Sequence, residues 1–249
     1  MYKLFIYPNL TEERYISKVK KAIHILKEKG YECLLNKEDN LRLFNNADYI
    51  GEASDCDLIV TLGGDGTFLR GSKLALSLDK PICGINCGDL GYLCTYQLKN
   101  IDKVDFESLK ISKSSTIEFE YNNETYYALN EVVIGKDYFG GTIHLKYSID
   151  DEEYIFKGDG LIICTSTGST GYNKSAGGSI FKDDDKMEVT PICPNGDIVK
   201  PMIVDNEAVI NVELINPKYT ASIYVDGNLL GPLNKIAIKD SKRSVKILR

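Results

Sequence analysis

Short apolar runs alternate with segments of helical period over residues 1–105. The run at 58–62 is apolar and β-branched and ends in glycines, which is typical of a buried strand that breaks into a tight loop. We expect Thr11 to cap the first helix, with Glu12 and Glu13 in its first turn, and Gly30 to end it. The expected strands are 3–7, 31–35, 58–62 and 81–86, and the expected helices are 11–29 and 68–78. Such alternation predicts a parallel α/β sheet.

The hydrophobic period changes to two from about residue 112 onward. Pairs of turn-forming residues recur between the β-rich runs of this part, at 122–123, 150–151, 195–196 and 226–227. We therefore expect an antiparallel sandwich or compact sheet assembly. A short helix-like stretch at 102–110 lies where the period changes. The fold class is accordingly α/β plus β, with an α/β domain at 1–105 and a β-rich domain at 106–231.

Composition narrows the class of protein. The 249 residues are 43% hydrophobic and 27% charged, with a net charge of −6, which argues against a surface for nucleic acid or anionic membranes. Seven cysteines without a Cys-x-x-Cys pair argue against a zinc site or a disulfide framework, and Cys83 and Cys87 are expected in a core under reducing, cytoplasmic conditions. The chain has only two histidines, His24 and His144, so a His-based catalytic triad is not expected. No apolar run is long enough to span a bilayer.

The loop after the run at 58–62 is rich in glycine and has a carboxylate in its middle. It comprises Gly63, Gly64, Asp65, Gly66 and Thr67, and we expect Thr67 to cap the helix that follows. Glycines let a bulky anion approach the main chain, and the N-terminus of a helix favours negative charge. A carboxylate at that place suits a hydroxyl that must lose a proton, or a metal. The combination indicates phosphoryl transfer to an alcohol, although Gly-Gly-Asp-Gly alone could be a structural turn.

A second glycine-rich turn, residues 87–93, follows the next expected strand at 81–86. Ligands of open α/β sheets bind where the carboxyl ends of strands meet such loops. Two consecutive strands that both end in glycine-rich loops therefore predict one crevice.

Two polar clusters stand out in the β-rich part. Asn130 and Glu131 interrupt an apolar context, and if buried they would need partners such as a ribose diol; an exposed hairpin edge is the alternative. The second cluster, residues 165–175, follows an apolar strand at 161–164 and combines small hydroxyl residues and glycines with Tyr172. This composition suits a nucleotide or polyhydroxyl ligand better than a flexible Ser/Thr linker.

These residues together resemble the NAD kinases, which phosphorylate the 2′-hydroxyl of the adenosine ribose of NAD to give NADP. Residues 63–70 are similar to the family's GGDG loop, which wider kinase superfamily members such as phosphofructokinases and lipid kinases share. Residues 85–93 resemble its I-N-x-G-x-L-G-F-L segment, 130–131 its Asn-Glu pair, and 158–175 its GDG…TGSTAY-x-x-S block. The resemblance implies a Rossmann-like N-terminal domain and a β-sandwich-like C-terminal domain, with residues 232–249 returning to the first.

The resemblance also implies roles for the matching residues. Asp65 would be the general base, and Gly63, Gly64 and Thr67 would form the phosphate loop. ATP would arrive with a divalent metal (Mg), with no metal site of the chain's own and no bound prosthetic group. Asn130 and Glu131 would hold the adenosine end of NAD, and Asp159 the nicotinamide end, of the same subunit or of a neighbour in a homodimer or homotetramer. The implied substrate-binding residues are Gly66, Arg70, Asn130, Glu131, Lys157, Asp159, Thr167, Thr170, Gly171, Tyr172, Asn173, Ser175, Cys193 and Asn228.

The sequence departs from the family pattern at three positions. Gly171 stands where Ala is usual, Asn195 where many members have His, and Asn228 where Gln is frequent. These departures concern contacts near the nicotinamide and leave open the choice between NAD and NADH. The sequence also leaves open whether ATP or polyphosphate is the donor and whether NADP feeds back. Two alternative functions stay open: a kinase of a lipid or sugar hydroxyl with the same loop, and a non-catalytic dinucleotide-binding regulator. The carboxylate of Asp65 argues against the regulator, because phosphate binding gains nothing from it.

Overall fold

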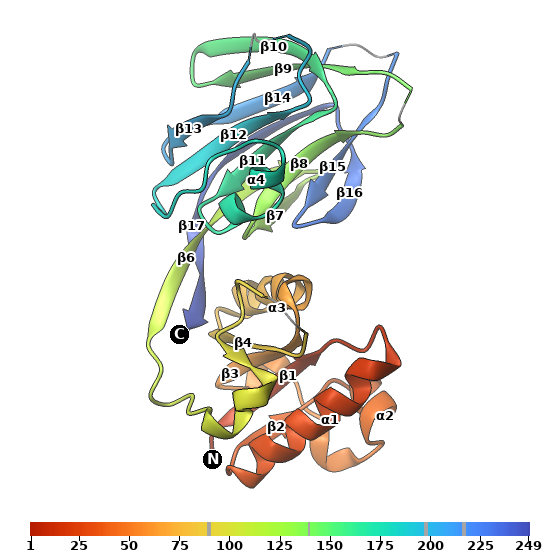
Figure 1. Ribbon diagram of the computed structural model, residues 1–249, viewed down its shortest axis with the longest axis vertical. Coiled ribbons are helices and arrows are strands. Elements are labelled where there is room, and N and C mark those ends of the chain that lie inside the picture. Colours follow the sequence, from red (N-terminus) through yellow and green to blue (C-terminus); the bar gives the residue numbers. More distant parts are fainter. Residues whose placement is uncertain (89–90, 139, 197–198, 216–217) are drawn as a thin grey trace. The chain divides into compact units, whose positions relative to one another are not determined.

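The computed structural model (Figure 1) divides the chain into two compact units. Unit 1 comprises Met1–Lys113 and Val245–Arg249, and unit 2 comprises Ser114–Ser244. The structure describes residues 1–88, 91–138, 140–196, 199–215 and 218–249. The division falls inside two long strands, β6 (Ile111–Tyr121) and β17 (Lys235–Leu248). The first division lies next to residue 112, where the hydrophobic period changes, whereas the domain bounds expected from the sequence were 105/106 and 231/232.

Unit 1 contains a parallel sheet in the order β2-β1-β3-β4. Its strands are β1 (Lys3–Pro8), β2 (Glu32–Leu34), β3 (Leu58–Gly63), β4 (Ile82–Asn86) and the short β5 (Tyr96–Gln97), which pairs with β4. Ile247 of β17 also pairs in parallel with Ile82 of β4. The α/β class predicted from the alternating pattern is confirmed.

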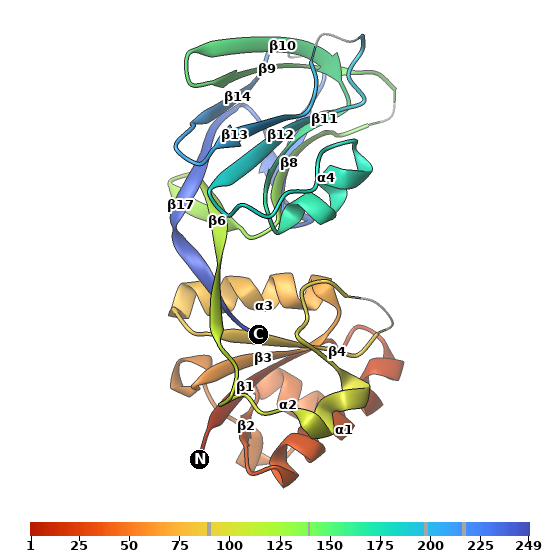
Figure 2. The ribbon, with the colours of Figure 1, turned by 60° about the vertical axis from the view of Figure 1, so that its left-hand side comes forward.

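Helices cover both faces of this sheet, with α3 on one side and α1 on the other (Figure 2). The helices are α1 (Glu13–Glu28), α2 (Lys37–Leu43) and α3 (Asp65–Leu78), and the 3-10 segments are η1 (Ala47–Tyr49), η2 (Ala53–Asp55) and η3 (Leu98–Lys103). Side chains alternate between the faces of a strand. Leu4, Val60 and Cys83 therefore share a core with Ile23 of α1, while Thr61 of β3 packs against Gly71 of α3.

Two local expectations in unit 1 are wrong. Thr11 does not cap α1, because its backbone N–H and its hydroxyl both donate to Oδ1 of Asn9 (3.1 and 2.8 Å), and the helix begins at Glu13. The stretch 102–110 is not a helix: the 3-10 segment η3 covers only its first two residues, and residues 104–110 are irregular. The end of α1 is as predicted, with Gly30 at a φ of +89°.

Unit 2 consists of two antiparallel sheets and two short helical segments. In the first sheet β10, β9, β14 and β17 pair in that order, and β6 joins β17 to β7. The second has the order β13-β12-β11-β8-β15-β16. The remaining bounds are β7 (Glu124–Ala128), β8 (Glu131–Lys136), β9 (Ile143–Ile149), β10 (Glu152–Gly158), β11 (Gly160–Thr165), η4 (Gly168–Thr170), α4 (Tyr172–Ser175), β12 (Lys186–Ile192), β13 (Met202–Asp205), β14 (Ile210–Leu214), β15 (Ala221–Val225) and β16 (Asn228–Pro232).

One hydrophobic core fills the space between the two sheets of unit 2. The first sheet contributes Phe119 and Tyr147, and the second contributes Ile134, Ile163 and Val189. This packing of sheet on sheet confirms the predicted sandwich-like architecture.

Three of the four predicted turn pairs join strands as hairpins. Asn122–Asn123 and Asp226–Gly227 have positive φ at both positions, as a two-residue hairpin turn requires, and Asp150 has a φ of +51° between β9 and β10. Asn195–Gly196 instead forms a bend after β12. Among the described residues, no helix is long and apolar enough to cross a membrane.

Candidate functional site

The glycine-rich loop of unit 1 opens α3 at Asp65 rather than at Phe68. Gly64 is the N-cap residue, and its carbonyl accepts hydrogen bonds from the N–H groups of Thr67 and Phe68 (2.9 and 3.1 Å). The expectation that Thr67 caps the helix is therefore wrong, because Thr67 already lies in the first turn, buried against Gly63. The shift places the carboxylate of Asp65 at the first position of a 14-residue helix, next to its unpaired N–H groups.

Backbone N–H groups of the second glycine-rich turn hold the carboxylate of Asp65. Tyr92 donates to Oδ2 (2.9 Å) and Leu93 donates to Oδ1 (3.1 Å). The loop can approach this closely because residue 91 is glycine: a Cβ there would lie 2.9 Å from both Asp65 Oδ1 and Asn86 Nδ2. The predicted meeting of the two glycine-rich turns is thus confirmed for residues 91–93, while Asp89 and Leu90 lie outside the described residues.

Asn86 presents an unsatisfied donor beside this carboxylate. Its Oδ1 accepts a hydrogen bond from the N–H of Gly88 (2.8 Å), but its buried Nδ2 has no hydrogen-bond partner. A buried amide without a partner costs free energy, so it points to a ligand that the site receives. An oxygen of a phosphate or hydroxyl group would satisfy it.

Two basic side chains of unit 1 lie near the carboxyl ends of the strands. Arg70 is exposed on α3 and donates to Oγ1 of Thr67 (3.4 Å). Lys18 of α1 donates from Nζ to the carbonyl of Cys87, directly after β4 (2.7 Å). Sequence reasoning missed Lys18. The topology could have indicated Lys18. It lies on α1, the helix that directly follows β1, and such a helix starts at the edge where the parallel strands end.

In unit 2 a single carboxylate holds the Asn130–Glu131 pair. The N–H groups of Leu129, Asn130 and Glu131 donate to Asp226 at 3.1, 2.8 and 3.2 Å. Asp226 lies in the turn between β15 and β16, and sequence reasoning assigned it no more than a turn. Its side chain fixes the backbone from which the amide of Asn130 and the carboxylate of Glu131 project.

Glu131 is buried, so the alternative of an exposed hairpin edge is wrong. Its side chain is 7% exposed, and its Oε2 and the Oδ1 of Asn130 have no hydrogen-bond partner. Burial raises the pKa of Glu131 to about 7, and the negative charge of Asp226 adds to that rise. Like the Nδ2 of Asn86, these two oxygens would be satisfied by a polar ligand.

The block at 165–175 packs directly on this pair. The hydroxyl of Thr165 donates to the carbonyl of Leu129 (2.6 Å), and the N–H of Thr165 donates to the carbonyl of Asn130 (2.9 Å). A side chain at Gly168 would clash with the Asn130 carbonyl, so only glycine allows the close approach. The block forms η4 and α4 and is not a flexible linker.

A cavity of about 510 Å³ in unit 2 brings together four of the predicted site residues: Glu131, Asp159, Tyr172 and Cys193. Nζ of Lys136 contacts Oδ1 of Asp159 at 2.6 Å and forms an ion pair inside this cavity. The remaining lining residues are Val133, Gly135, Lys136, Ile192, Tyr224 and Gly227. The lining combines opposite charges with two aromatic rings, which suits a polar ligand with a flat ring.

Lys157, the expected basic residue of this region, is exposed on β10 and does not line the cavity. Phe156 and Gly158 point inward, so strand alternation turns Lys157 outward. Lys136, at the end of β8, supplies the basic group instead. No local pattern distinguished these two lysines.

Two predicted amides are used inside the protein. Asn173 is fully buried: its Nδ2 donates to Glu188 (2.6 Å) and its Oδ1 accepts from Thr190 (2.6 Å), so it anchors α4 and does not face the cavity. Asn228 donates to the carbonyls of Val225 and Asp226 and closes its own turn.

The other predicted residues of the 167–175 block do not line the cavity. Thr170 and Ser175 are exposed and Thr167 is half-buried. Gly171 lies close to Glu131, because a Cβ at residue 171 would be 3.6 Å from Oε2 of Glu131. Glycine at this position leaves space beside the unpartnered carboxylate.

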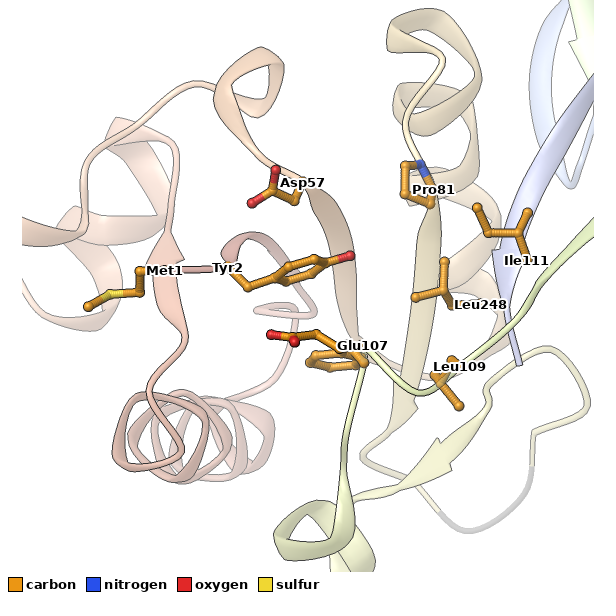
Figure 3. A pocket seen from close by; sticks show the side chains of 9 residues that line it. Met1, Tyr2, Asp57, Pro81, Glu107, Leu109, Ile111 and Leu248 are labelled. Carbon is orange, nitrogen blue, oxygen red and sulfur yellow. The ribbon is translucent and has the colours of Figure 1, made fainter.

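A second cavity, of about 580 Å³, lies in unit 1 where β1, β3 and β4 begin (Figure 3). Asp57, Tyr2 and Glu107 lie on one side of it, and apolar residues such as Pro81 and Leu248 lie on the other. It is at the opposite end of the strands from Asp65, and none of the predicted site residues lines it. Among the described residues, no group of three or more His, Cys, Asp or Glu side chains could hold a metal ion.

The sequence matches two family models over most of its length: the ATP-NAD kinase N-terminal domain at residues 10–105 and the ATP-NAD kinase C-terminal domain at 129–249. An NAD kinase of Clostridium beijerinckii is 34% identical over 225 positions, covering 84% of this chain and 79% of the relative. An NAD kinase of Chlorobium phaeobacteroides is 33% identical over 261 positions, covering 99% and 91%.

Two solved structures are similar to the whole chain. An NAD kinase from Archaeoglobus fulgidus in complex with ATP superposes with a TM-score of 0.77 at 26% identity, covering 100% of this chain and 94% of that one. Yeast NADH kinase complexed with NADH superposes with a TM-score of 0.83 at 22% identity, covering 100% and 83%. The latter shows likeness of fold.

Asp226→Asn is expected to lower the free energy of unfolding by about 1–3 kcal/mol, because an amide group replaces one of the oxygens that accept the three N–H groups. Chemical denaturation measures this. Asp205→Asn is the matched control: Asp205 is exposed and paired with Lys186, so its loss should cost less than about 1 kcal/mol. Equal effects of the two substitutions would contradict the role of Asp226.

Glu131→Gln is expected to change how stability depends on pH. The carboxyl of Glu131 has a pKa of about 7 in the folded chain against an ordinary value of 4.5, so the unfolded state ionises first as pH rises. Raising the pH from 4.5 to about 7 should therefore destabilise the native chain relative to Glu131→Gln. Below that range the carboxyl is protonated in both states, and this loss of stability disappears. Urea denaturation of both proteins from about pH 4.5 to about pH 8 tests this. A stability difference that does not change with pH would contradict it.

Proposed function

The chain belongs to the ATP-NAD kinase family and is an ATP-dependent NAD kinase, and from that premise we propose how its own residues carry the reaction. The enzyme transfers the γ-phosphoryl group of ATP to the 2′-hydroxyl of the adenosine ribose of NAD and releases NADP. The single observation that supports our assignment is the carboxylate of Asp65, held by two N–H groups at the opening of α3.

Asp65 acts as the general base. Each of its oxygens accepts one backbone hydrogen bond, which leaves further lone pairs for a hydroxyl proton. As the 2′-oxygen attacks phosphorus, its proton moves to Asp65 and the bond between the γ-phosphorus and the β-bridging oxygen breaks. A carboxylate that orients and then deprotonates the acceptor alcohol is an arrangement that protein kinases also use.

The start of α3 receives the phosphates of ATP. Its first N–H groups and its dipole favour negative charge, and Gly64 leaves open space, since a Cβ there would meet nothing within 4 Å. Arg70, Lys18 and the unpartnered Nδ2 of Asn86 add donors at the same edge of unit 1. Magnesium enters with ATP as part of the substrate and neutralises phosphate charge there.

The cavity of unit 2 and the neighbouring Asn130–Glu131 pair bind NAD. The unpartnered oxygens of Asn130 and Glu131 accept hydrogen bonds from ribose hydroxyls of the adenosine part. The Lys136–Asp159 pair, with Tyr172, holds the nicotinamide end, of the same subunit or of a neighbouring one. We further propose that the enzyme is cytoplasmic and forms a homodimer or homotetramer, as the family resemblance implies.

The alternative kinases and the regulator receive no support from the site. Family membership assigns NAD as the acceptor in place of a lipid or sugar. A regulator that binds only NAD would have no use for a carboxylate held at the opening of the phosphate loop.

Asp65→Asn is expected to leave the affinity for NAD within a few-fold and to lower kcat by about 10²–10⁴, the usual contribution of a general base. NADP formation from NAD and Mg-ATP, coupled to an NADP-specific dehydrogenase, gives kcat, and calorimetry gives the affinity. Asp48→Asn is the control, because Asp48 is exposed on η1 and its side chain should not affect turnover. Unchanged turnover in Asp65→Asn would remove Asp65 from its role as base.

Glu131→Ala is expected to raise the KM for NAD more than the KM for ATP, because Glu131 faces the proposed dinucleotide site. Steady-state kinetics with each substrate varied in turn measure the two constants. Glu153→Ala, which removes an exposed partner of Lys146 on the other sheet, should move neither. A change confined to the KM for ATP would overturn the assignment of Glu131 to NAD.

A further inference from the structure

The seven cysteines of the chain differ sharply in their surroundings. All seven are free thiols in described parts of the chain. Cys94 is half-buried and Cys193 is exposed, and the others are buried: Cys33, Cys56, Cys83, Cys87 and Cys164. The surface of the protein therefore presents one fully accessible thiol.

Burial also suppresses the chemistry of the other six thiols. It raises the pKa of Cys33, Cys83 and Cys94 to about 12 and that of Cys87 to about 11. The pKa values of Cys56 and Cys164 are raised for the same reason. Because the thiolate is the nucleophile, these six groups are unreactive near neutral pH, and five of them are also buried. Thiol chemistry is thus left to Cys193.

Cys193 lies in the wall of the 510 Å³ cavity that also contains Glu131 and the Lys136–Asp159 pair. Glu131 lines the same cavity and is more than nine-tenths buried, and its Oε2 has no hydrogen-bond partner, which indicates a ligand site independently of the cysteine. An adduct on the sulfur of Cys193 would therefore occupy space that a ligand needs.

The backbone holds Cys193 firmly in this wall. Its φ is +46°, directly before Pro194. Just before Cys193, the carbonyl of Ile192 accepts a hydrogen bond from the N–H of Asp159 (2.9 Å). Just after it, the N–H of Asn195 donates to the carbonyl of Lys157 (2.8 Å). These two hydrogen bonds flank Cys193 and fix its place beside Asp159.

We propose that Cys193 is a covalent modification site that reacts by thiol–disulfide exchange with low-molecular-weight disulfides, and that the adduct blocks the dinucleotide site. The thiolate of Cys193 attacks one sulfur of the disulfide, whose S–S bond breaks as the new S–S bond forms. The other half leaves as a thiolate and takes up the proton that Cys193 has lost. Cys193 is oxidised and the leaving half is reduced. The blocking effect rests on the function proposed for this cavity, whereas the selectivity for Cys193 does not.

The test uses the full chain and oxidised glutathione. Intact-mass measurement and peptide mapping are expected to find one glutathione per chain, on Cys193. NAD should slow the labelling several-fold, and ATP alone should not. NADP formation should fall in proportion to labelling and return after dithiothreitol. An adduct on another cysteine, or labelling at the same rate with saturating NAD, would overturn the proposal.

Two variants provide matched comparisons, each judged by the ratio of its activity after and before treatment. For Cys193→Ser this ratio should stay near one, whatever its starting activity. For Cys94→Ser, which removes the next most accessible thiol, it should fall as in the native chain. Loss of activity in treated Cys193→Ser would overturn the proposal, as would full activity in native protein labelled at Cys193.

The outcomes separate this inference from the proposed function. If untreated protein makes no NADP while Cys193 is still labelled and protected by NAD, the assignment of catalysis fails and the modification site stands. If NADP forms normally and the label lies elsewhere, the modification site fails and the proposed function stands.

Discussion

Carboxylates that accept hydrogen bonds from main-chain N–H groups fix the candidate site residues in each unit. Backbone N–H groups that no sheet or helix can pair must find another acceptor when they are buried. In unit 1, Asp65 accepts two backbone N–H groups from residues 92–93, and in unit 2 Asp226 accepts three from residues 129–131. Each carboxylate joins segments that are distant in sequence. The loops around them can be rich in glycine and still be ordered, because an ionic acceptor gives stronger hydrogen bonds than a neutral one.

Among the described residues, five buried side-chain atoms have no hydrogen-bond partner, and three of them belong to residues of the candidate sites. Asn86 in unit 1 and Asn130 and Glu131 in unit 2 each have one such atom. In the free protein these atoms lower stability, because they lose water without gaining a hydrogen bond. A ligand that satisfies them recovers that free energy on binding. The same burial brings the pKa of Glu131 to about 7, so this side chain can accept or donate near neutral pH.

Sequence reasoning succeeded where local rules decide the structure. The alternation of strands and helices along unit 1, the end of α1 at Gly30 and the hairpin at Asp226–Gly227 follow from periodicity and turn chemistry. It failed where a distant residue decides. Asp226 looks like a turn residue until its partners, more than ninety positions earlier, are known. Asn173 looks like a ligand-binding amide until the fold surrounds it with Glu188 and Thr190, which share no local pattern with it.

The path of the chain through β6 and β17 makes unit 2 an insertion within unit 1. Residues 245–249 contribute to unit 1 through Ile247, which pairs with β4, and through Arg249, which exchanges two backbone hydrogen bonds with Lys110. On the ribosome these residues emerge only after all of unit 2. Unit 1, which contains Asp65, therefore lacks part of its sheet until unit 2, which contains Glu131, has been synthesised.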